Sequence, residues 1–195
     1  MRTETNLSTP RRTFLRGMAG LAGITALAAC TVTKTGNVTT ITLNTAEVLD
    51  YGDSVLSFAQ AGIGLTFVAS AIGVPGVAIA EAAITALKTA LAAFNTAAGG
   101  KATVSYDDTS AKTAFDSVVA SVKTINTYIV ATITATVSDS TIVTEAKTAA
   151  NAASGIISAI QGLVDSLGLE KRVGATLKAQ SDMAEIRVWL KTRTR

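Results

Sequence analysis

The stretch VAIAEAAITALKTALAAFNTAA, residues 77–98, decides the class of fold. Its apolar and small residues recur at intervals of three and four, a spacing that keeps them on one face of an α-helix. The residues on that face are Val77, Ala80, Ile84, Leu87, Leu91, Phe94 and Ala98. Two glycines follow and supply a natural stop. We therefore predict an amphipathic helix over 77–98 that buries this face.

The same spacing recurs on both sides of this segment and predicts three further helices. They cover about 45–73, 109–137 and 140–167, with inward-facing stripes that include Phe58, Phe115 and Ile156. Val74-Pro75-Gly76 separates the first of them from 77–98, since the residue before a proline avoids the helical conformation. Short connections favour antiparallel neighbours. The predicted fold is therefore mainly α, an antiparallel up-down four-helix bundle over 44–168.

Three other segments predict a small β element. They are 31–43, 102–106 and 186–192, in which β-branched residues gather or apolar and polar residues alternate. Segment 31–43 also suits an extended tether. A helix stays open for 186–192, because Asp182 and Glu185 have the spacing of a capping box. We favour a strand there that pairs with 39–43, which would bring both ends of the domain together.

The formal charge of +3 comes from the first 29 residues. From residue 30 onward thirteen basic and thirteen acidic residues balance, so nucleic acid is not an expected partner. Residues 169–195 nevertheless form a basic tail. Its candidates for contact with anionic lipid head groups are Arg187, Trp189, Lys191, Arg193 and Arg195. The alternatives are a solvated end and, for Trp189, a ring that caps the bundle core.

The segment RRTFLRGMAGLAGITALAAC, residues 11–30, begins with two arginines and ends on the single cysteine of the chain. Between them, residues 17–29 carry no charge. This run is too short to cross a bilayer, which takes about 20 residues. It has the length of the apolar region of a signal peptide. A buried N-terminal helix is the alternative.

Two motifs in this segment resemble known export signals. Arg11, Arg12, Phe14 and Leu15 resemble the twin-arginine (Tat) motif, although Pro10 departs from its usual first residue. Leu27, Ala28, Ala29 and Cys30 resemble the lipobox of bacterial lipoproteins. This resemblance implies that 1–29 is a removed signal peptide. It also implies that Cys30 is acylated and becomes the first residue of the mature protein. The acylated thiol would then anchor the protein to a membrane.

The resemblance also implies partners and a location. The Tat translocon and the lipoprotein-processing enzymes would act on the chain during export, and the membrane would hold it through acylated Cys30. Thr31 follows the cysteine where an aspartate would favour the inner membrane. We therefore expect the periplasmic face of the outer membrane or the cell surface, with residues 30–43 as a lipid-anchored tether or short β segment.

The inventory of reactive residues is small. The chain contains no histidine, and anchorage uses the only thiol, which leaves carboxylates, lysines and tyrosines. Asp50 and Asp53 share a helix face that suits solvent better than a cation. Asp107-Asp108 suits a turn and a helix cap, and Gly62-Ile63-Gly64 suits a close helix contact or a bend. We expect no catalytic residue, metal ligand or cofactor, and therefore no enzyme.

These expectations favour a lipid-anchored, non-enzymatic envelope protein whose bundle is a structural or adaptor module for an unknown envelope protein. Two alternatives stay open. Residues 54–80 carry no charge, so 54–98 could insert into a membrane or assemble into a pore. The bundle interior could also carry a small ligand or cofactor.

Overall fold

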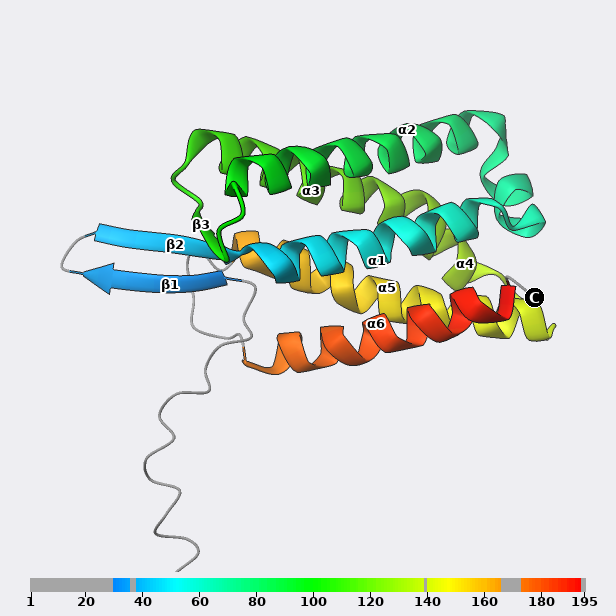
Figure 1. Ribbon diagram of the computed structural model, residues 1–195. Coiled ribbons are helices and arrows are strands. Elements are labelled where there is room, and N and C mark those ends of the chain that lie inside the picture. Colours follow the sequence, from blue (N-terminus) through cyan, green and yellow to red (C-terminus); the bar gives the residue numbers. More distant parts are fainter. Residues whose placement is uncertain (1–29, 36–37, 139, 166–172, 194–195) are drawn as a thin grey trace, which may run out of the picture.

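A computed structural model describes residues 30–35, 38–138, 140–165 and 173–193. The elements in chain order are β1 (Cys30–Thr35), β2 (Val38–Asn44), α1 (Thr45–Ile63), α2 (Thr66–Ala98), β3 (Thr103–Ser105), α3 (Thr109–Ile125), the π-helical turn η2 (Asn126–Val130), α4 (Ala131–Ala135), α5 (Thr141–Asp165) and α6 (Val173–Arg193). Long helices lie side by side, with a small antiparallel sheet at one end (Figure 1). The protein is therefore mainly α with a small β element, as predicted.

The sheet has the strand order β1-β2-β3. β1 and β2 pair antiparallel from Cys30 opposite Leu43 to Thr35 opposite Val38, which confirms the β element predicted over 31–43. β3 adds Val104 opposite Leu43. Leu43 and Val104 are buried, so the sheet covers the end of the helical core at which α1 begins.

The predicted strand over 186–192 is wrong, because these residues lie in α6. Ile186 and Trp189 are both buried, at a spacing of three that puts them on one helix face. β1 pairs along one side of β2, and β3 pairs with Thr42, Leu43 and Asn44 on the other side. α6 runs away from the sheet and ends at the opposite end of the bundle (Figure 1), so the two ends of the domain do not meet.

The four-helix bundle is not confirmed, because α6 is a further long helix that packs against α5 and α1. Its indole ring at Trp189 lies on Phe58 of α1, with ring centroids 5.5 Å apart. Trp189 is 5% exposed and Phe58 is fully buried. The C-terminal segment is thus part of the packed domain, although the sequence pattern places it outside the bundle.

The first predicted helix, 45–73, ends ten residues too late. α1 stops at Ile63, where Gly64 caps it and buried Leu65 starts a turn into α2. The Pro-Gly signal instead marks a kink inside α2. There Gly73 has φ 66° and ψ 175°, a conformation that only glycine adopts readily. The kink leaves Pro75 near the start of a new helical stretch, where its missing N–H is tolerated.

The third and fourth predicted helices are confirmed to within two residues at each end. α3, η2 and α4 form one continuous helical stretch over 109–135, and α5 covers 141–165. Ile125, Ile129 and Ile133 are all fully buried although they are spaced by four. The wider turn of η2 keeps residues at this spacing on one face. Ile142, near the start of α5, is 61% exposed.

Glycines on α1 allow close approach of its neighbours. A Cβ on Gly62 would lie 2.8 Å from Cγ2 of Ile129. A Cβ on Gly52 would overlap the side chain of Leu91 on α2. The close helix contact predicted for Gly62 is therefore confirmed, and Gly52 makes a second one.

Gly62→Ala is expected to lower the free energy of unfolding by about 1–3 kcal/mol, because overpacking against Ile129 costs this much. Gly162→Ala on α5 is the matched control. Outside its own stretch of helix, no described atom lies within 4 Å of the new Cβ, so better helix propensity should stabilise this variant by up to about 1 kcal/mol. Urea unfolding followed by circular dichroism measures both. Equal changes in the two variants would contradict the close contact.

Candidate functional site

The predicted anchor residue, Cys30, is the first residue of β1 and pairs with Leu43 of β2. The next residue on β2, Asn44, caps α1, since its Oδ1 accepts a hydrogen bond of 3.2 Å from the backbone N–H of Glu47. Position 30 is therefore joined to the bundle through a paired strand. The other residues of the two export motifs, Arg11, Arg12, Phe14, Leu15, Leu27, Ala28 and Ala29, lie outside the described residues.

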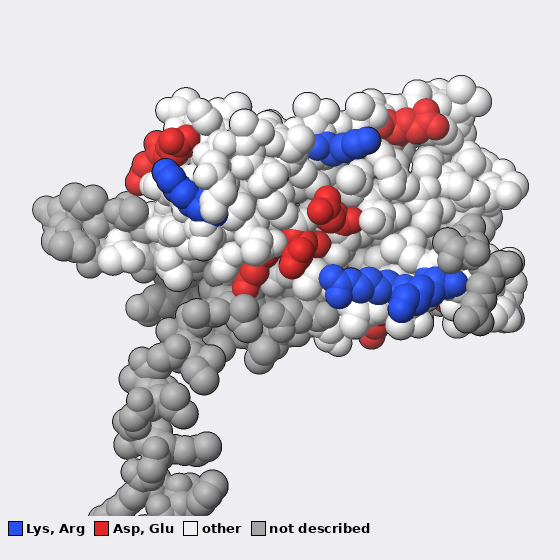
Figure 2. Space-filling model, viewed as in Figure 1, with Lys and Arg blue, Asp and Glu red and all other residues white. Residues whose placement is uncertain are grey.

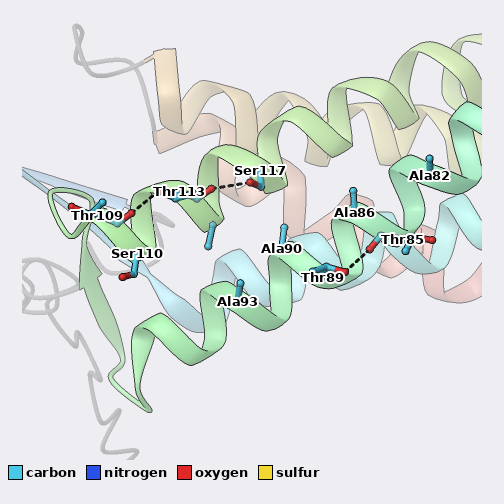
Figure 3. Close-up of a pocket in the computed structure, with 11 residues that line it drawn as sticks. Ala82, Thr85, Ala86, Thr89, Ala90, Ala93, Thr109, Ser110, Thr113 and Ser117 are labelled. Carbon is cyan, nitrogen blue, oxygen red and sulfur yellow. Dashed lines mark hydrogen bonds between the residues drawn. The ribbon is translucent and has the colours of Figure 1, made fainter.

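A groove runs between α2 and α3, with a volume of about 890 Å³. Figure 3 shows its walls, with residues between Ala82 and Ala93 on one helix and between Thr109 and Ser117 on the other. Only Ala, Thr and Ser line it: Ala82, Thr85, Ala86, Thr89, Ala90, Ala93, Thr109, Ser110, Thr113, Ala114 and Ser117. Among the described residues, the groove lining contains hydroxyl groups but no carboxylate, lysine or tyrosine.

Three of the six hydroxyls that line this groove are bonded within their own helices. Thr89 Oγ1 donates to the Thr85 carbonyl at 3.0 Å, and Thr113 Oγ1 donates to the Thr109 carbonyl at 2.8 Å. Ser117 Oγ donates to the Thr113 carbonyl at 2.9 Å. Such bonds consume the donors and leave methyl and methylene groups facing outward. The arrangement suits an apolar helix or an acyl chain better than a polar ligand.

A buried polar cluster lies at the start of α1. The carboxylate oxygens of Glu47 and the hydroxyls of Thr45 and Tyr51 are buried without a hydrogen-bond partner among the described residues. Burial, and then the charge of Asp50, raise the pKa of Glu47. Burial, Glu47 and Asp50 together raise the pKa of Tyr51 to about 12. The neutral forms of both side chains are therefore favoured.

The sequence analysis missed Glu47. The available signal was its position four residues before Tyr51, which puts both on the inward face of α1. Asp50 and Asp53 are exposed, as expected of a solvated face. Among the described residues no group of three or more His, Cys, Asp or Glu side chains could hold a metal ion.

Tyr106, Lys112 and Asp116 form a hydrogen-bonded clasp between the end of β3 and α3. The Tyr106 hydroxyl donates to Asp116 Oδ1 at 2.6 Å. Lys112 Nζ donates to the Tyr106 oxygen at 2.8 Å and to Asp116 Oδ2 at 2.9 Å. Burial acts to raise the pKa of Asp116, but these bonds outweigh it and lower that pKa. Asp108 caps α3 by accepting from two backbone N–H groups, which confirms the predicted cap.

The basic tail lies on α6. Figure 2 shows blue side chains over α6 beside a row of red ones over α1. Arg187 and Lys191 are exposed, whereas Trp189 is buried against Phe58 and so occupies the core position that was its alternative. Arg193 ends α6, its side chain is not among those described, and Arg195 lies outside the described residues.

No protein-family model matches this chain, and no curated protein or solved structure matches it either. Two helical stretches are long and apolar enough to cross a membrane, Thr66–Ala98 and Thr109–Ala135. In their 18-residue windows of highest hydropathy, 28% and 39% of the residues are buried. Both walls of the groove therefore belong to helices with apolar residues left at the surface.

Glu47 makes stability depend on pH. Its raised pKa means that the folded protein binds more protons than the unfolded chain between the ordinary and the raised value. The stability due to protonated Glu47 is therefore complete below its ordinary pKa of 4.5 and is lost as pH rises through the raised pKa. Glu47→Gln should remove this loss, with a gain of about 1 kcal/mol near pH 8 and none near pH 4.

Thermal and urea unfolding across this pH range measure the effect. Glu145→Gln on α5 is the matched control, because Glu145 is exposed, and it should leave the pH profile unchanged. A profile that is the same for Glu47→Gln and the parent chain would contradict the unpaired buried carboxyl.

Proposed function

We propose that this chain is a lipid-anchored bacterial envelope protein whose helical domain is a non-enzymatic structural or adaptor module. The observation that carries the proposal is the position of Cys30. The residue at the end of the lipobox-like motif is also the first residue of β1, paired with Leu43. A lipid on Cys30 would therefore be attached at the edge of the folded domain, without a long intervening tether.

Export by the Tat translocon is the second part of the proposal. This route carries folded substrates, and a helical domain with many local contacts suits rapid folding before export. In this proposal α1, α2, the α3–α4 stretch and α5 form an antiparallel up-down core, which α6 covers. The contacts of α1 with α2 and α5, and of α2 with α3, support this arrangement.

The proposed location is the periplasmic face of the outer membrane or the cell surface. Lipoprotein-processing enzymes would act on the precursor, and the membrane would then hold it. An envelope protein of unknown identity would bind the bundle. The groove between α2 and α3 supports an adaptor role better than an enzymatic one, because its lining residues are Ala, Thr and Ser.

Acylation can be tested directly in a bacterial host supplied with an alkyne analogue of palmitate. We expect the parent chain to take up the label and to sediment with membranes, and Cys30→Ser to lose both properties. Thr33→Ser, an exposed substitution on the same strand, is the control and should retain the label. An unlabelled parent chain, or a labelled Cys30→Ser variant, would refute the anchor.

The Tat route needs its own variants. Replacing Arg11 and Arg12 together by lysine keeps the charge but removes the guanidinium pair, and it should leave the precursor unprocessed in the cytoplasm. Processing of that variant at the parent rate would assign export to the general secretory route, while acylation at Cys30 could still hold.

Membrane insertion by residues 54–98 is a second candidate function. It is favoured by the length and apolar composition of α2 and by its exposed residues Val74 and Ile79, which are 84% and 42% exposed. Hydroxyl groups bonded within their own helix, such as Thr89 and Thr96, are also compatible with an apolar surrounding.

A leakage assay separates the two functions. If α2 inserts, the Cys30→Ser chain should release dye from vesicles of phosphatidylethanolamine and phosphatidylglycerol. Ile79→Asp should then reduce release, because an aspartate at the centre of a spanning helix costs about 2.5–3.5 kcal/mol. Glu145→Gln is the control that should leak like its parent. Vesicles that stay intact at every protein-to-lipid ratio would eliminate the second function.

A further inference from the structure

The outward face of α2 carries a second regular stripe of residues. Its members lie four and three apart in alternation, as in a heptad repeat. They are Ala78, Ala82, Thr85, Thr89, Ala92 and Thr96, and all six are exposed. The core-facing stripe, which includes Ala80, Leu87 and Phe94, lies on the other side of the helix and is buried. The sequence of α2 therefore has the pattern of a helix that packs on two faces. Among the described residues, the core-facing stripe is buried and the outward stripe is exposed.

Only two charged residues occur in the 33 residues of α2, Glu81 and Lys88. Both are exposed, and no ion pair involving either is found within the described part of the chain. They are seven residues apart, so they take the same heptad position, on one flank of the outward stripe. In heptad letters, with Ala82 and Thr89 at a and Thr85 at d, both charges occupy position g.

We propose that the outward stripe of α2 binds the same stripe on a second copy of the chain, with the two helices antiparallel about a two-fold axis near Thr85. In an antiparallel pair, position g of one helix faces position g of the other. Glu81 then lies opposite Lys88 of the partner subunit, and the two-fold axis repeats this contact. In a parallel pair position g instead faces position e of the other helix, so Glu81 and Lys88 would lie opposite alanines and form no ion pair. The charges therefore select the antiparallel arrangement.

The other flank of the stripe fits the same interface. There Ala86 and Ala93, at heptad position e, open into the groove between α2 and α3. Small side chains let two helix axes approach closely, as at Gly52 and Gly62 inside this domain. The hydroxyls of Thr89 and Thr96 donate to carbonyls of their own helix. Docking would therefore leave neither hydroxyl without a hydrogen-bond acceptor. This interface does not depend on acylation of Cys30.

Charge exchange tests the proposal, in the full chain carrying Cys30→Ser so that no lipid intervenes. Sedimentation equilibrium should show a reversible dimer for this parent. Glu81→Lys and Lys88→Glu should each weaken dimerisation at least about tenfold, because each places equal charges opposite one another twice. A mixture of the two variants should form a heterodimer, and the chain carrying both exchanges should dimerise like the parent.

Two controls guard against effects on folding. Glu145→Lys on α5 changes an exposed charge away from the stripe and should leave the dimer unchanged. Circular dichroism and thermal melting should be nearly the same for all variants, since Glu81 and Lys88 are exposed. As an independent measurement, Thr85→Cys should form an interchain disulfide under mild oxidation, which requires Cα atoms within about 7 Å. Thr144→Cys on α5 should not.

A parent chain that stays monomeric at every concentration would overturn the proposal. If that monomer binds or permeabilises vesicles, the outward face of α2 belongs to the membrane instead. A parent dimer that survives both single charge exchanges, with no cross-link through Thr85→Cys, would also overturn it, because the contact would then lie elsewhere on the surface.

Discussion

Close approach of helix axes is the constraint on which this domain depends. Many of its buried side chains are alanines, and an alanine buries little area, so cohesion has to come from short distances between helices. Gly62 against Ile129 and Gly52 against Leu91 provide those distances along α1. The few large side chains then fill what remains. Phe94 lies 6.1 Å from Phe115 between ring centroids, and Phe58 lies 5.5 Å from Trp189.

The same helices present apolar surfaces in spite of their many serine and threonine hydroxyls. Many of their hydroxyls donate to a carbonyl four residues earlier, as Thr89 does to Thr85 and Thr113 does to Thr109. The groove between α2 and α3 therefore has the chemistry of a packing surface. A second protein helix and a lipid phase are the two surroundings that such a surface suits, and both proposals for α2 start from this property.

The geometry also separates the two ends of the described chain. Cys30 lies in the sheet, beside the start of α1, whereas α6 carries Arg187 and Lys191 towards the opposite end (Figure 1). A 21-residue helix is about 30 Å long, so a membrane that holds Cys30 would not meet both regions unless the bundle lay along its surface. The basic face of α6 therefore suits a protein partner with acidic side chains as well as it suits lipid.

The local sequence determined the helices of this protein and much of their burial. The 3.6-residue periodicity, the helix caps and the glycine stops each depend on residues close together in the chain. Residues 77–98, the stripe from Phe115 to Ile133 and the cap at Asp108 needed nothing else. Tertiary structure decided four other features. α6 is a helix whose Trp189 packs on Phe58 of α1, a contact between residues far apart in the sequence. The turn at Gly64 was added before the predicted break at Pro75, which is present as the kink at Gly73; buried Leu65 and the contact of Gly62 with Ile129 hold the chain at the earlier turn. Glu47 was buried by its surroundings. The groove formed only where α2 meets α3. Such features depend on pairs of residues far apart in the sequence, and periodicity along the chain does not specify those pairs.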